Sequence, residues 1–210
     1  MVHGLVNSAY MRRILLSIIA VLLLSCPAST MMLEGIVGGG GSYGVFSQTL
    51  NIDNVGWIGY SVRTKIPSSA LSASASKVSI RLEAASTEGM KIVQCYIGHA
   101  AASGNAWNFD GGQVKVTFGG ADNGTITAGS TLESDTVSFN LDKTKDLIIA
   151  FDITNTDTAN DSAKTAEGVS GHFKYSNLTS GTLQAQLTAP TGYATNIGDV
   201  YLVNRITAHR

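Results

Sequence analysis

Apolar and polar residues alternate along much of the chain beyond residue 45. Segment 78–82 places an aliphatic side chain at every second position, and segments 114–118 and 183–187 repeat the alternation. A period of two residues is typical of a strand with one buried and one solvated face. The further segments in which we expect strands are 45–52, 56–66, 89–98, 131–140, 171–176 and 198–207.

Residues 147–151 are apolar at every position, which predicts a central strand buried on both faces. The stretch 67–76 opens with proline but is rich in serine, which favours a loop over a helix. About ten short strands separated by glycine turns predict an all-β domain, a two-sheet antiparallel sandwich of jelly-roll-like type. The side chains expected in its core are Val78, Ile80, Leu82, Val116, Phe118, Ile149, Phe151 and Leu202.

The N-terminal thirty residues have the pattern of a targeting segment. Arg12 and Arg13 precede an apolar run at 14–24, and small residues follow it. The run would make only about 17 Å of helix, against a bilayer core of ~30 Å, so a cleaved signal is favoured over a membrane anchor.

Two other interpretations of this region stay open. Residues 23–26 read Leu-Leu-Ser-Cys, which resembles a bacterial lipobox with Cys26 as the lipidated residue. Alternatively, Met31 or Met32 is the true start. We expect residues 31–44 to be a linker, because four consecutive glycines at 38–41 have almost no conformational preference. The folded domain is then expected over residues 45–210.

The content of charged residues and the net charge indicate which binding partners to expect. Charged residues make up 14% of the chain, well below an average of about 25%, and the formal net charge is −1. The longest basic cluster is the pair at positions 12 and 13, whereas a nucleic-acid partner requires clustered lysine or arginine to neutralise phosphates. We therefore expect no nucleic-acid binding.

The order of segments in the middle of the chain resembles a known accessory domain. The segments are 77–84, 114–120, 126–130, 132–135 and 146–152. Together they are similar to the β-sandwich domain that precedes the catalytic domain in some secreted SGNH hydrolases, over roughly residues 56–176. Stand-alone domains of this kind are familiar from phage and prophage structural proteins. The resemblance implies a sandwich that displays a surface.

The resemblance does not extend to catalysis. Gly198-Asp199 is followed by valine instead of the nucleophilic serine of an SGNH hydrolase, and no aspartate has histidine three residues later. There is no Gly-x-Ser-x-Gly elbow. We therefore predict that the protein is not an enzyme.

Metal and cofactor sites are not predicted either. His99 and His172 lack a cysteine or carboxylate at ligand spacing, so zinc is disfavoured. The loop 152–161 has oxygen ligands at alternating positions but departs from the EF-hand pattern, which leaves calcium as the weaker alternative to a solvated loop. Cys95 is expected to be a buried, inert thiol.

The candidate ligand-binding residues lie in the polar loop 103–110. Trp107 could stack on a sugar ring, with Asn105, Asn108 and Asp110 hydrogen-bonding to its hydroxyls. The opposing interpretation is that Trp107 folds back as a plug on the open end of the sandwich.

These features favour a phage or prophage virion structural protein of decoration, fibre or adhesion type, located in the virion. Its expected partners are other virion proteins or further copies of itself, and cell-surface polysaccharide is the candidate ligand. The alternative is an extracellular or periplasmic carbohydrate-binding protein of bacteria, secreted or lipid-anchored.

Overall fold

The computed structural model describes residues 41–55, 59–153, 162–165, 173–177, 183–190, 195–196 and 203–210. All strand pairs among these residues are antiparallel. One sheet has the order β1-β14-β4-β8, with β9 also paired to β4. Its strands are β1 (Ser42–Ser47), β4 (Ala75–Glu83), β8 (Thr131–Glu133), β9 (Val137–Leu141) and β14 (Val203–His209).

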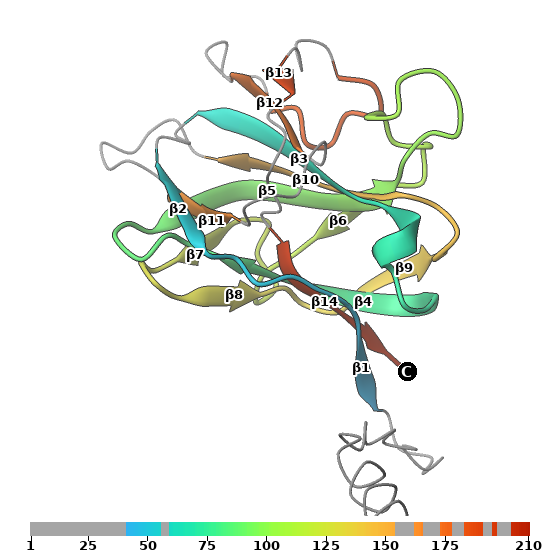
Figure 1. Cartoon of the computed structure of the whole chain (residues 1–210), viewed down its shortest axis with the longest axis horizontal. Coiled ribbons are helices and arrows are strands. Elements are labelled where there is room, and N and C mark those ends of the chain that lie inside the picture. Colours follow the sequence, from blue (N-terminus) through green and yellow to red (C-terminus); the bar gives the residue numbers. More distant parts are fainter. Residues whose placement is uncertain are drawn as a thin grey trace, which may run out of the picture. The chain divides into compact units, whose positions relative to one another are not determined.

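The second sheet has the order β13-β12-β3-β10-β5-β6, with β7 also paired to β5. Its strands are β3 (Tyr60–Ile66), β5 (Met90–His99), β6 (Val114–Val116), β7 (Gly124–Ile126), β10 (Leu147–Ile153), β12 (Phe173–Asn177) and β13 (Thr195–Asn196). A separate pair joins β2 (Ile52–Val55) to β11 (Ser162–Thr165). The predicted two-sheet antiparallel sandwich is confirmed (Figure 1).

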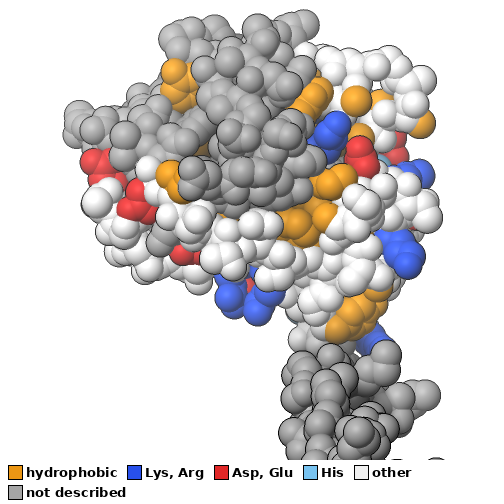
Figure 2. Space-filling model, in the orientation of Figure 1, with side chains coloured by type: hydrophobic (Ala, Val, Ile, Leu, Met, Phe, Trp, Pro, Cys, Tyr) orange, Lys and Arg blue, Asp and Glu red, His pale blue; other side chains and the backbone are white. Residues whose placement is uncertain are grey.

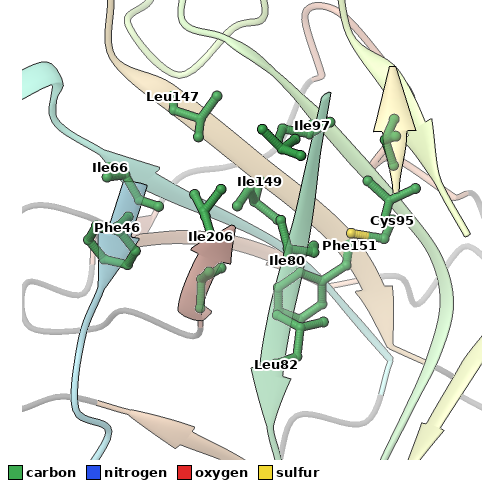
Figure 3. Close-up of a cluster of buried hydrophobic side chains, with 14 of the residues drawn as sticks. Phe46, Ile66, Ile80, Leu82, Cys95, Ile97, Leu147, Ile149, Phe151 and Ile206 are labelled. Carbon is green, nitrogen blue, oxygen red and sulfur yellow. The ribbon is translucent and has the colours of Figure 1, made fainter. Parts of the chain in front are cut away.

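The hydrophobic core lies between the two sheets. Ile80 and Leu82 of β4 and Ile206 of β14 meet Ile149 and Phe151 of β10 (Figure 3). Seven of the eight predicted core side chains are at most 7% exposed, and the eighth, at position 202, lies outside the described residues.

Strand β10 is buried at every position, as its unbroken apolar run predicts. It pairs with β3 on one side and β5 on the other, so Phe151 lies between Val62 and Cys95. Cys95 is fully buried, and burial is the first cause that raises the pKa of its thiol. This environment fits the expected inert thiol, because a reactive cysteine needs an accessible thiolate.

The prediction of a strand at 183–187 is wrong. Residues 183–190 form an irregular segment with a turn, in which Ala185 is buried and Leu187 is 39% exposed. The Asp152 carboxylate accepts hydrogen bonds from the backbone amides of Gln184 and Ala185. These amides therefore bind a side chain and not a neighbouring strand, which overrides the alternating pattern.

The hydrophobic pattern does not predict strand β7, because its first residue is the glycine of Asn123-Gly124, a dipeptide that is typical of turns. A Cβ at Gly124 would lie 2.6 Å from Leu132 and 3.1 Å from Phe118, so glycine here permits close packing. Asp135 lies farther along the chain, and its carboxylate accepts hydrogen bonds from the amides of Gly119 and Gly120. The positive φ of both glycines is used to wrap the backbone around this carboxylate.

The ends of the folded body lie side by side at the edge of the five-stranded sheet. Strand β1 pairs with β14, and Ser42 lies opposite His209 (Figure 1). β1 begins inside the stretch that was predicted as linker, so residues 42–44 belong to the sheet.

The predicted loop at 67–76 contains one 3-10 turn, Ser68–Ala70. No helix within the described ranges is long and apolar enough to cross a membrane.

Candidate functional site

Two loops cover the outer face of the seven-stranded sheet. They are residues 100–113, after β5, and residues 183–190. Phe109 and Ala185 from these loops pack on Ile148 and Ala150 of β10, forming a second, smaller apolar cluster. This cover explains why β10 is buried on both faces.

A buried arginine holds the two loops together. The guanidinium of Arg63, on β3, donates to the backbone oxygen of Trp107 in one loop and of Leu187 in the other. The Arg63 Cζ atom lies 4.3 Å from the centre of the Phe109 ring, and the residue is fully buried. One side chain therefore combines two charge-assisted hydrogen bonds with a cation–π contact.

Trp107 is not an exposed platform. It is 7% exposed, and the Lys65 ammonium lies 5.0 Å from the centre of its ring. The Asn105 side-chain oxygen accepts the Trp107 N–H at 3.0 Å, and the Asn105 carbonyl accepts the Asn108 N–H at 2.9 Å. This turn carries the ring onto the sheet, so the geometry is that of the plug, and the expected stacking of Trp107 on a sugar lacks an accessible ring face.

The remaining predicted residue, Asp110, is exposed and lies at two adjoining hollows, which we call the end hollows. They lie where β5 ends and β10 begins, and both are lined by Asp110 and Lys145. The first, of about 370 Å³, is lined also by Ala100, Ala101, Ala102, Ala106, Thr144 and Asp146. The second, of about 480 Å³, is lined also by His99, Gly112, Val114, Ser138, Phe139, Asn140 and Asp142.

Backbone turns orient the polar groups of the end hollows. The Asp142 carboxylate accepts from the hydroxyl and the amide of Thr144, at 2.7 and 2.9 Å, and these bonds lower the pKa of Asp142. The Asp110 carboxylate accepts the Gly112 N–H at 2.9 Å. The Lys145 ammonium lies 4.0 Å from Asp110, a loose ion pair that leaves both groups available to a ligand.

His99 forms the inner wall of the second hollow. It is 6% exposed, and its ring centre lies 4.9 Å from that of Phe139. Its Nε2 accepts the backbone N–H of Asp142 at 3.0 Å. Nε2 is therefore unprotonated and the ring is neutral, with its proton on Nδ1. Burial is the first cause that lowers the pKa of His99.

A serine–histidine pair elsewhere is structural. Ser79 Oγ lies 2.9 Å from His209 Nε2, but the hydroxyl donates to Glu133 at 2.8 Å. Its one proton is committed to the carboxylate, so His209 must donate to Ser79, the reverse of nucleophile activation. Ser79 is also 2% exposed, out of reach of a substrate.

Metal-binding expectations are only partly covered by the structure. The described residues contain no group of three or more histidine, cysteine or carboxylate side chains that could hold a metal ion. His172 and residues 154–161 of the loop considered for calcium lie outside the described residues.

The fold and the end hollows define a two-sheet antiparallel β-sandwich with polar recesses between its loops. No family model matches the chain, and no curated protein sequence matches it.

Proposed function

We propose that the chain is a non-enzymatic virion structural protein of decoration, fibre or adhesion type, and that its end hollows bind cell-surface glycans. The observation that carries the proposal is the pair of end hollows around Asp110 and Lys145. These two charged groups come from two loops at one end of the sandwich, and loops are the usual place for a binding surface on this architecture.

The chemistry of the end hollows suits a ligand rich in hydroxyl groups. Lys145 is a donor, Asp110 and Asp142 are acceptors, and Asn140 offers both functions. The alanines of the first hollow give a small apolar wall for the C–H face of a sugar. Because turns hold the two carboxylates in place, little side-chain freedom is lost on binding.

Binding is favoured over catalysis by the state of the one histidine that lines these hollows. A general base needs a free ring nitrogen, whereas His99 Nε2 is occupied by the Asp142 amide. The sparse charge of the surface also suits a displayed domain, since charged side chains form small, separate groups in Figure 2.

Glycan-array binding of the full chain and of two variants tests the proposal. Asp110→Asn and Lys145→Ala should each weaken binding at least tenfold and leave the melting temperature nearly unchanged. The matched controls are Asp122→Asn and Lys115→Ala, which alter an exposed ion pair of 2.8 Å elsewhere. These controls should bind as the wild type does. Unchanged binding by both site variants, or no glycan bound at all, contradicts the proposal.

The alternative is a secreted or lipid-anchored carbohydrate-binding protein of bacteria. Its support is the signal-like pattern at 1–30 and the lipobox-like residues ending at Cys26. The mass of the mature N-terminus separates the two proposals. A diacylglyceryl group on Cys26 would rule out the virion, whereas co-purification of the chain with particles would support it.

A further inference from the structure

We propose that His99 is a proton switch for the end hollows, so that acidification rearranges their walls and releases the ligand. This inference rests on the proposed function for the identity of the ligand only. The switch itself is a property of the unliganded domain.

The hydrogen bond between Asp142 N–H and His99 Nε2 exists in one protonation state. A neutral ring can accept at Nε2, but an imidazolium has a proton on both nitrogens and accepts nothing. Protonation of His99 therefore places two donors, Nε2–H and the Asp142 amide, face to face across 3.0 Å. The two groups must separate.

The charged groups around the ring supply its new partners. Asp110, from the loop after β5, and Asp142, from the turn before β10, both favour the protonated ring, and Lys145 opposes it. Phe139 of β9 contributes an uncharged contact. The balance of these charges is negative, so an imidazolium would pair with a carboxylate of the second hollow.

This change reaches the ligand through the turn at 142–146. The turn is held by His99 at Asp142, by the Ser74 hydroxyl at Lys143, and at Asp146, whose carboxylate accepts the Ser68 N–H and whose carbonyl accepts the Ala100 N–H. Protonation of His99 removes the first attachment and leaves the others. Thr144 and Lys145, which line the first hollow, are then less constrained and can move relative to Asp110.

Acidification also reduces the number of carboxylate acceptors that are open to the ligand. A carboxylate engaged by the imidazolium no longer accepts a sugar hydroxyl, so affinity should fall as His99 becomes protonated. Because burial lowers the pKa of His99 below its ordinary value of about 6.5, the transition is expected below pH 6.5.

Nuclear magnetic resonance of the full chain without ligand tests the switch. The His99 ring and the Asp142 amide should titrate with one common midpoint below pH 6.5. Amide hydrogen exchange at Asp142 should accelerate at least tenfold, beyond the intrinsic pH effect, as the ring is protonated. In His99→Gln, whose side-chain oxygen can still accept, the midpoint should vanish from the Asp142 amide. The control His209→Gln should retain it.

An Asp142 amide that does not follow the His99 ring in the wild type overturns the switch, even if His99→Gln fails to fold. So does a midpoint at or above pH 6.5. If a bound glycan is found, its dissociation constant should rise at least tenfold across the same midpoint, and an unchanged constant contradicts the inference. The coupled titration without any glycan binding would refute the proposed function and leave the switch intact.

Discussion

Replacing Arg63 with methionine should loosen the two loops that cover the seven-stranded sheet. Methionine keeps much of the aliphatic length of the side chain but donates no hydrogen bond. The carbonyls of Trp107 and Leu187 lose the guanidinium that holds them, and Phe109 loses its cation. The loops keep their apolar contacts, the amides bound by Asp152, and direct hydrogen bonds to each other, such as the one from Phe109 N–H to the Thr188 carbonyl at 2.9 Å.

The cost can be worked from these contacts. A buried polar group left without its partner costs about 1–3 kcal/mol, so two carbonyls cost about 2–6 kcal/mol. Removal of a buried charge offsets part of this, because desolvation of a guanidinium is unfavourable. We expect a net loss of about 3 kcal/mol. With a urea m-value of about 2 kcal/mol per molar, the unfolding midpoint should fall by about 1.5 M.

Arg81→Met is the matched control, because Arg81 is also on a strand but is only half-buried and pairs with Glu133 at 2.9 Å. Its loss should cost about 0.2–1 kcal/mol. Urea unfolding followed by circular dichroism compares the two variants. Equal unfolding midpoints would refute the role of Arg63 in holding the two loops. The same conclusion would follow if the amides of 107–110 in Arg63→Met exchanged as slowly as in the wild type.

Two further predictions concern the core and pH. Phe151→Ala should cost about 3–5 kcal/mol in urea unfolding, whereas the exposed Leu187→Ala should cost under ~1 kcal/mol; a similar small loss in both would contradict the central position of β10. Hydrogen bonds from the Gly120 amide and the Thr117 hydroxyl lower the pKa of Asp135, so its stabilisation is complete above its unfolded pKa of about 3.9 and is lost as the pH falls through the lower folded value. The difference in unfolding midpoint between wild type and Asp135→Asn should thus be constant above about pH 5 and shrink below about pH 4, and a difference that persists unchanged at pH 2 would contradict this assignment.

Much of the sandwich could be predicted because its information is local. The two-residue period of β4 and the unbroken apolar run of β10 indicate which positions are buried. The apolar positions of both strands are buried as predicted, although Ser79, on the polar side of the β4 pattern, is buried as well. A strand needs no knowledge of its partner to show this pattern. The same holds for Cys95, whose apolar neighbours predict a buried thiol.

The loops and the site could not be predicted to the same degree, because distant partners decide them. Arg63, 44 positions earlier in the chain, binds the Trp107 carbonyl and holds that residue in its buried position. Asp152, 33 positions before Ala185, does the same by accepting the Ala185 N–H. Asp110 was predicted as a site residue, but its neighbours Lys145 and Asp142 come from a different turn. The one sequence feature that drew attention to His99 is its position at the end of an apolar strand. That position does not distinguish the proposed proton switch from a histidine with a purely structural role.

The pairing of β1 with β14 determines how the domain would respond to tension. Ser42 and His209 lie opposite each other at one end of an antiparallel pair. A force that pulls these two residues apart therefore loads the hydrogen bonds one after another, as in a zipper, instead of shearing them all together. The domain would be mechanically weak as a link pulled from both ends.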